Sequence, residues 1–303
     1  MLGEIKDLDK GILIIETDYS DNDFEIEWKG VQKIFTESNF LVTTSDGNRY
    51  NGTLMSTEEG KIMIRDADAG NIAYASEEIV FLKSVDKKFW SRVNASIDVG
   101  WSVTKAQNFR QLTVRSNVGY MADRWSADAN YNTLNSTQDD TDPIRRTDGG
   151  LAFRQYLPND WYLPVDLTFL SNTEQKIDLR TNAKIGFGKY VIHTNSSYWG
   201  FAAGASYVNE VFTEAERNSW EGYFGTELNL YDIGDFSLLT RVVGYPGITE
   251  SGRWRADFVL DTKYDLPLDF YIKLGYTLNY DNQPAEGAPD ADYVFSTGLG
   301  WEL

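Results

Sequence analysis

The most constraining feature of this sequence is a strict two-residue alternation near its C-terminal end. From Phe270 to Tyr280 every second residue is apolar, and the same pattern, interrupted at Thr297, runs from Tyr293 to Leu303. A period of two places one set of side chains on each face of a β-strand. Each run is about ten residues long, the span of a tilted strand that crosses a bilayer. We therefore expect these runs to form the closing hairpin of an outer-membrane β-barrel.

Composition narrows the class of protein. The 303 residues include 16 Phe, 18 Tyr and 9 Trp, too many aromatic residues for a disordered chain. No stretch approaches the eighteen or so consecutive apolar residues of a helical membrane span. The absence of cysteine excludes disulfides and thiolate metal sites. A net charge of −18 argues against nucleic-acid binding, because phosphates would be repelled.

Residues 1–88 read as short strands separated by Gly, Asp and Ser, and they repeat internally. The segment 3–15 aligns with 52–64, and the segment 24–34 aligns with 72–82. We predict a small β domain of the SH3 or Sm type, in tandem form, placed in the periplasm. No export signal is visible at the start of the chain, so a leader is expected to have been removed.

Residues 89–303 contain longer alternating runs. We expect twelve antiparallel strands, at 91–104, 109–121, 125–137, 146–157, 161–172, 176–191, 197–210, 219–231, 235–246, 253–265, 268–281 and 291–303. Tight turns alternate with longer polar loops, which is typical of outer-membrane barrels with periplasmic turns. The fold class predicted is all-β: a twelve-stranded antiparallel transmembrane β-barrel after a small SH3/Sm-like domain.

The two faces of the predicted barrel differ in composition. Aromatic residues near the strand ends are expected to contact lipid: Trp101, Trp125, Trp161, Trp254, Phe270, Tyr280, Tyr293 and Trp301. Charged residues on the other face are expected to line the lumen: Asp98, Arg115, Asp128, Arg154, Asp166, Arg180, Lys184, Glu221, Glu227, Arg241, Arg253, Arg255, Asp257, Asp261 and Lys273. Acids and bases are nearly balanced there, which favours a lumen closed by ion pairs, with a narrow polar channel as the alternative.

Residues suited to catalysis are scarce. The only histidine, His193, lies in a tight turn near Ser196 and Ser197, and no Asp or Asn is clearly placed to orient it. We therefore expect no enzyme, with a lipid-modifying enzyme that uses His193 as the remaining alternative, and the sequence predicts no cofactor and no metal site.

Two parts of the sequence resemble known sequence patterns. The end of the chain resembles the C-terminal signal read by barrel-insertion machinery, through Ser296, Gly298, Trp301 and Leu303. Residues 89–303 resemble a family described as salt-induced outer-membrane proteins, through FWSRVNASIDVGWSVTKAQNFRQLTVRSNVGY, STQDDTDPIRRTD, FLSNTEQKIDLRTNAKIGFGKY and GTELNLYDIGDFSLLT. The resemblance implies a Gram-negative outer-membrane barrel but no activity.

The expected function is accordingly a non-enzymatic barrel, structural or related to envelope stress. The alternatives are a narrow pore for small solutes and a scaffold that recruits a periplasmic protein through residues 1–88. Outer-membrane lipid and the insertion machinery are the expected partners.

Overall fold

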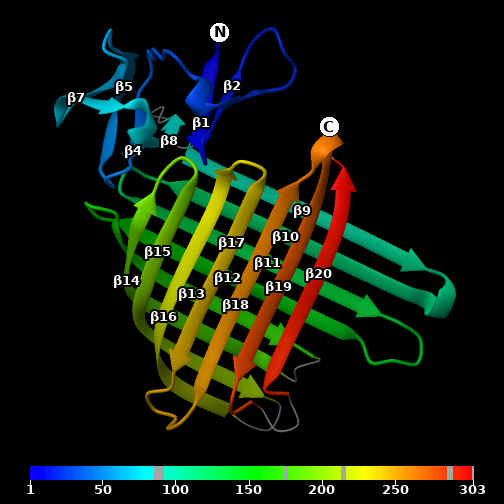
Figure 1. The fold of residues 1–303 in the computed structure, drawn as a ribbon. Coiled ribbons are helices and arrows are strands. Elements are labelled where there is room, and N and C mark those ends of the chain that lie inside the picture. Colours follow the sequence, from blue (N-terminus) through cyan, green and yellow to red (C-terminus); the bar gives the residue numbers. More distant parts are fainter. Residues whose placement is uncertain (85–91, 174–176, 213–215, 285–288, 302–303) are drawn as a thin grey trace.

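The computed structural model describes residues 1–84, 92–173, 177–212, 216–284 and 289–301. The predicted domain boundary at 88/89 and the predicted contact of Leu303 lie outside these residues. The described chain forms two antiparallel sheets, one of eight strands and one of twelve (Figure 1). Among the described residues, helical structure is limited to short 3-10 turns.

The twelve-stranded sheet is a meander in which each strand pairs with its neighbours in sequence. Its strands are β9 (Val93–Thr104), β10 (Phe109–Met121), β11 (Trp125–Thr137), β12 (Ile144–Tyr156), β13 (Trp161–Asn172), β14 (Ile177–His193), β15 (Ser197–Phe212), β16 (Glu216–Ile233), β17 (Phe236–Pro246), β18 (Trp254–Asp265), β19 (Phe270–Asp281) and β20 (Ala291–Trp301). The twelve predicted strands are confirmed, because alternation in each run marks which residues can share a face.

The largest differences from the predicted bounds occur at β14 and β16, which extend farther at one or both ends. Pro164 occupies an interior position of β13, where a residue without a backbone N–H interrupts a ladder. Pairing between β13 and β14 passes from Tyr162/Gly188 to Val165/Ile185 without a partner for Pro164. The other side of β13 retains its register, with Pro164 opposite Arg154.

The predicted closure of the twelve strands into a barrel is not observed. Within the described residues, the sheet order runs from β9 to β20 without pairing of these two strands. The sheet is nevertheless folded over on itself, with the later strands in front of the earlier ones in Figure 1. The exposure of nearly all of β9 and β20 follows from this arrangement, because each has a neighbour on one side only.

The eight-stranded sheet has the order β3-β2-β1-β8-β4-β5-β6-β7. Its strands are β1 (Glu4–Asp9), β2 (Ile12–Glu16), β3 (Phe24–Glu27), β4 (Phe40–Thr44), β5 (Arg49–Ser56), β6 (Lys61–Asp66), β7 (Gly70–Ala75) and β8 (Ile79–Ser84). Its core is an apolar cluster that includes Leu8, Val42, Leu54, Ile64 and Leu82. Burial of such side chains stabilises a fold by about 2 kcal/mol each.

The order of these strands has an internal symmetry, and the aligned sequence segments cover the first three strands of each half. Strands β1 to β4 and β5 to β8 are successive halves, and the fourth strand of each half pairs with the first strand of the other. A 3-10 turn precedes each fourth strand, at Trp28–Gly30 and at Ser76–Glu78. The Trp28 indole N–H donates to the Ser76 carbonyl at 2.7 Å, so the two equivalent turns contact each other. The halves therefore form one sheet.

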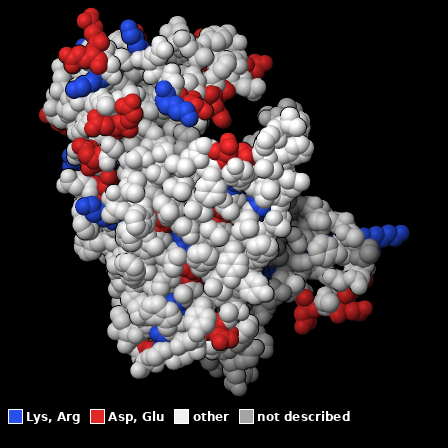
Figure 2. Space-filling model, viewed as in Figure 1, with Lys and Arg blue, Asp and Glu red and all other residues white. Residues whose placement is uncertain are grey.

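The eight-stranded sheet lies at one end of the twelve-stranded sheet, beside its tight turns (Figure 1). Charged side chains cluster over this N-terminal part, whereas the visible surface of the twelve-stranded sheet is mainly uncharged (Figure 2). The described residues contain no helix with the length and apolar character needed to span a membrane.

Candidate functional site

The two faces of the twelve-stranded sheet have opposite character. On one face Ile185, Phe187 and Phe224 are 60%, 63% and 59% exposed, whereas on the other Glu221 is completely buried. The buried charges make contacts between strands that are not neighbours, such as Arg255 of β18 with Glu221 of β16. Such contacts require the strands to curve towards each other, so this is the concave face.

The predicted lumen charges lie on the concave face, and register brings many of them opposite a residue of the other sign. The directly opposed pairs are Arg115 with Asp98, Lys184 with Asp166, Arg180 with Glu210, Arg241 with Glu227, and Arg255 with Asp281. Ion pairs join Arg180 to Glu210 at 2.5 Å and Lys184 to Asp166 at 3.5 Å. Arg241 also contacts Glu227.

Other predicted lumen residues occupy less enclosed positions. Arg154 donates to the Tyr190 hydroxyl at 3.3 Å and lies over the Tyr162 ring. Asp257 is half-buried, whereas Asp128, Asp261 and Lys273 are exposed at the surface of the concave face. These residues therefore differ in burial, although the alternation in sequence is the same for all.

The residues predicted to form an aromatic belt are mostly exposed. The exposed members are Trp101, Trp161, Trp254, Phe270, Tyr293 and Trp301. Trp125 and Tyr280 are half-buried. Trp125 stacks on Phe153 with ring centroids 5.8 Å apart, which accounts for its lower exposure.

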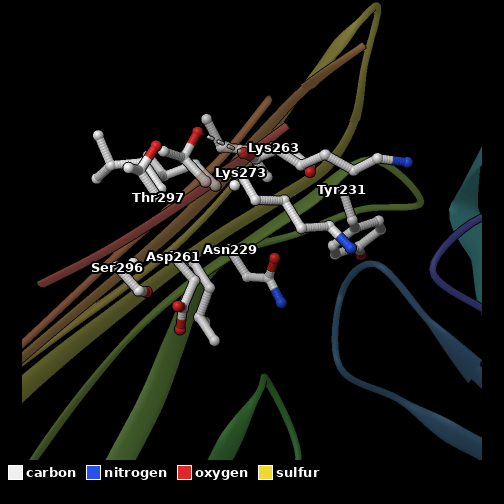
Figure 3. Close-up of a pocket in the computed structure, with 15 residues that line it drawn as sticks. Asn229, Tyr231, Asp261, Lys263, Lys273, Ser296 and Thr297 are labelled. Atoms are coloured by element: carbon white, nitrogen blue, oxygen red, sulfur yellow. Dashed lines mark hydrogen bonds between the residues drawn. The ribbon is translucent and has the colours of Figure 1, made fainter. Parts of the chain in front are cut away.

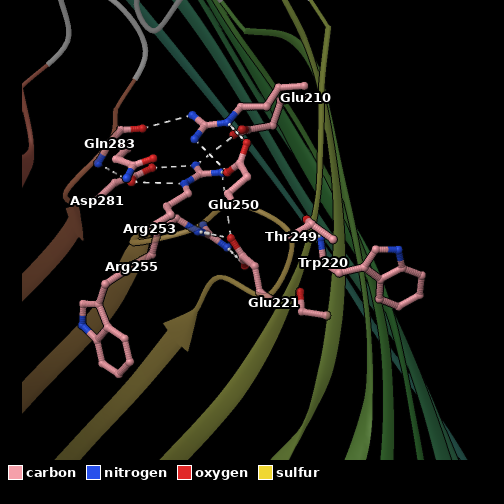
Figure 4. Close-up of polar contacts among 12 residues, drawn as sticks. Glu210, Trp220, Glu221, Thr249, Glu250, Arg253, Arg255, Asp281 and Gln283 are labelled. Atoms are coloured by element: carbon pink, nitrogen blue, oxygen red, sulfur yellow. Dashed lines mark hydrogen bonds and ion pairs between the residues drawn. The ribbon is translucent and has the colours of Figure 1, made fainter.

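A dense ionic cluster lies on the concave face (Figure 4), at the end away from the N-terminal sheet (Figure 1). Arg253, only 3% exposed, donates to the Asp281 carboxylate at 2.6 Å and to Glu250 at 2.8 Å. Its guanidinium also lies 3.5 Å from Glu210. Next to it, Arg255 donates two hydrogen bonds to Glu221, at 3.0 and 2.6 Å.

The connection between β17 and β18 supplies the centre of this cluster. Its Thr249 hydroxyl accepts a hydrogen bond from the Trp220 backbone N–H at 2.9 Å, which anchors the connection to β16 (Figure 4). Glu250 accepts hydrogen bonds from both Arg217 and Arg253. Burial raises the pKa of Glu250, but these two arginines outweigh burial and hold that pKa below its ordinary value. Because every buried charge has an opposite partner, the cluster avoids the cost of an isolated buried ion.

The opposite end of the concave face is covered by the N-terminal sheet. The Arg49 guanidinium lies 3.9 Å from the centroid of the Tyr156 ring and donates to the Asp123 carbonyl at 3.2 Å. Burial lowers the pKa of Arg49, and the nearby Tyr156 and Asp123 oppose that shift. The Asn195 amide donates to the Ile79 carbonyl at 2.8 Å, so contacts run in both directions. We call the N-terminal sheet in this position the cap.

Two glycines allow the cap to approach closely. Gly11 and Gly47 have φ of +76° and +78°, and a Cβ at either position would overlap backbone atoms of Asn195 or Asp160. Gly60 holds the equivalent position in the second half of the cap, with φ of +78°, and has open space around it. The left-handed turn is therefore common to both halves, whereas the close contact belongs to the first.

A cavity of about 190 Å³ lies where the cap meets the turns. Its lining includes Lys10 and Arg49 from the cap and Tyr190, His193 and Tyr231 from the twelve-stranded sheet. Tyr190 lies between Tyr162 and Tyr198, at ring-centroid distances of 5.0 and 5.7 Å. The cap thus closes this end against a cluster of aromatic rings.

The family model for a protein of unknown function, DUF481, matches residues 94–302. The chain belongs to this family. The match covers the twelve-stranded sheet from β9 onward and leaves the cap outside it. No curated protein matches the chain.

The family region contains a second, larger cavity of about 580 Å³ along β16 to β20. We call it the groove. Its polar lining includes Asn229, Tyr231, Asp261, Lys263 and Lys273 (Figure 3). Tyr231 lines both the groove and the cavity beneath the cap, so the two spaces share a wall.

The environment of His193 differs from the prediction. Its Nδ1 lies 2.9 Å from Oδ1 of Asp160, so an aspartate does orient the ring. No sequence pattern indicated this pair, because Asp160 precedes β13 and His193 ends β14, 33 positions away. The neighbouring Ser196 and Ser197 hydroxyls instead contact Thr194. In the described part of the chain, no serine hydroxyl is recorded as hydrogen-bonded to His193.

Several residues of the ionic cluster and cap were missed by sequence reasoning. Glu210 is the last residue of the predicted run 197–210, and Arg217 lies outside the predicted run 219–231, because β15 and β16 both extend beyond those runs. Alternation continued through β15 would have placed Glu210 on the same face as Ser206. Glu250 lies in an irregular connection and Arg49 in the cap, where no pattern indicates their contacts.

Replacing Arg255 by Ala should lower the free energy of unfolding by about 3–5 kcal/mol, because Glu221 would remain buried with a weaker partner. Chemical denaturation followed by tryptophan fluorescence measures the change. Arg145→Ala is the matched control, because Arg145 is exposed and should change stability by less than about 0.5 kcal/mol. Equal effects of the two variants would contradict a structural role for the cluster.

Gly11→Ala and Gly60→Ala should each cost about 1–2 kcal/mol in the cap, since both residues have positive φ. Only Gly11→Ala should also loosen the cap, because its methyl group would meet the Asn195 carbonyl. Hydrogen exchange measured by mass spectrometry should then accelerate in residues 194–197 for Gly11→Ala alone. Similar exchange in the two variants would show that the cap contact at Gly11 has no role in docking.

Proposed function

We propose that this protein is a non-enzymatic outer-membrane β-barrel with a charged interior that is narrowed at both ends. The observation that carries the proposal is the inverted distribution of side chains in the twelve-stranded sheet. Apolar residues such as Ile185 and Phe187 are exposed, whereas Glu221 and Arg253 are buried. A water-soluble sheet buries its apolar face, while a membrane barrel presents that face to lipid.

The locations of the ionic cluster and the cap support an interior that is narrowed at both ends. The cluster joins β14, β15, β16, β18 and β19 at one end through paired charges. The cap covers the other end through Arg49 and the turn glycines. We infer a stabilising role in the envelope for such a barrel, with the cap on the periplasmic side because the tight turns are there.

Closure of the barrel is part of this proposal. Strands β9 and β20 have 12 and 11 residues, and both lie at free edges of the sheet. An unpaired edge exposes backbone groups that cannot remain unsatisfied in hydrocarbon. Pairing of β9 with β20 would satisfy them and, with an even number of strands, would be antiparallel.

Reconstitution into bilayers with brominated lipid tests the membrane location. Quenching of tryptophan fluorescence should be strong, because residues such as Trp254 face outward and are exposed. Trp254→Phe should reduce the quenched part of the emission. Trp28→Phe should reduce the unquenched part, since Trp28 is buried in the cap. A full chain that stays monomeric in buffer and shows no quenching would exclude the proposal.

Engineered cysteines test closure, and the sequence contains no native cysteine to interfere. Ser96 and Ser102 of β9, combined in turn with Ser296 and Gly298 of β20, give four double variants on the inward-facing positions. At least one pair should form an intramolecular disulfide in bilayers, because directly opposed residues on paired strands have Cβ atoms about 4.5–5.5 Å apart, close to the separation that a disulfide needs. The double variant Ile97→Cys/Ser296→Cys should form no intramolecular disulfide, because the two residues lie on opposite faces of the sheet. Only intermolecular disulfides would indicate an open edge.

A further inference from the structure

On the concave face, one pair of directly opposed residues carries charges of the same sign. In six register pairs of the described residues a cation lies opposite an acid, but Lys263 of β18 lies directly opposite Lys273 of β19. Like charges directly opposite each other destabilise a sheet. The cap contains a second pair of opposed like charges, Glu4 and Glu16, and there Lys6 forms ion pairs with both. A counter-charge thus accompanies the opposed acids.

The two lysines converge on the same ring. The Lys263 and Lys273 ammonium groups lie 4.8 and 4.6 Å from the centroid of Tyr271. Lys263 also contacts Asp265 at 3.0 Å. For Lys273, no ion pair with an acid occurs among the residues that the structure describes. The ring face attracts both cations, but it is a weaker counter-charge than an anion.

The groove provides space and polar groups around this pair. In register, Lys263 is flanked by Ser237 and Lys273 by Gly298, and a Cβ at Gly298 would meet nothing within 4 Å. Figure 3 shows both lysine side chains extending along the groove towards Tyr231. One row farther from the cap, Asn229 and Asp261 supply an amide and a carboxylate.

We infer that the groove binds a small hydroxylated anion, with a phosphate monoester held by Lys263 and Lys273. The phosphate supplies the counter-charge that Lys273 does not receive from an acid among the described residues, and Lys263 adds a second donor next to its ion pair with Asp265. Asn229 and Asp261 then contact hydroxyl groups of the ligand, because a carboxylate accepts hydrogen bonds and an amide both donates and accepts them. This inference goes beyond the proposed function and does not depend on where the protein resides.

The test measures binding to the full chain at low salt in a non-ionic detergent, by thermal unfolding and calorimetry. Glucose 6-phosphate should raise the melting temperature, whereas glucose at the same concentration should not. Lys273→Gln should weaken binding by about tenfold or more, since it removes a charged hydrogen-bond donor. Lys105→Gln has the same change in charge at an exposed turn, and its affinity should equal that of the unmodified chain.

Charge reversal separates a binding role from a structural one. Lys273→Glu should raise the melting temperature without ligand, because it turns a repulsive cross-strand pair into an attractive one. The same variant should lose the response to glucose 6-phosphate. Short-chain phosphatidic acid in the same detergent distinguishes a lipid headgroup from a soluble ester, and binding of either that depends on Lys273 supports the site. An equal response of the unmodified chain and Lys273→Gln, or no response at all, would overturn it.

Discussion

The burial of Arg253 is the constraint on which one end of the structure depends. A guanidinium that is 3% exposed must have its charge and its donors satisfied, and here Asp281 and Glu250 do so, with Glu210 nearby. These acids come from β19, from the connection before β18 and from β15. The ion pairs of Arg253 therefore hold β15 and β19 together and fix the path of the connection before β18.

The same principle organises the rest of the concave face. Polar and charged groups occupy positions that an apolar core would fill in a soluble sheet, so cohesion comes from ion pairs, tyrosines and hydrogen bonds. Among the described residues, the large buried apolar cluster lies in the cap instead. The cap is thus an ordinary hydrophobic sheet, and the family region is organised in the opposite way.

The cap shows how a repeated sequence acquires unequal roles. Its halves share the strand pattern and the turn glycines, but only the first half places Gly11 against a turn of the family region. Arg49, at the start of the second half, extends towards Tyr156. Docking therefore depends on which copy faces the turns, and the internal symmetry is broken by contact with an asymmetric neighbour.

The sequence by itself determined the all-β class, the twelve strands and the face on which the predicted lumen charges lie. Alternation with a period of two is local, and a strand has only two faces, so residues such as Glu221 and Phe187 could be assigned without a structure. Sequence also indicated the repeat in the cap, because the turn glycines recur at a fixed spacing.

Only the tertiary structure decided which charges are buried, which partners they have and how the cap docks. The contacts of Arg253 with Glu210 and of His193 with Asp160 join residues far apart in sequence, and alternation carries no information about register or curvature. The direct opposition of Lys263 and Lys273 depends on the register of β18 with β19, which the turn between them sets. Whether a charge pairs or repels is therefore decided by that alignment of strands, because a shift of one residue would place each side chain on the other face.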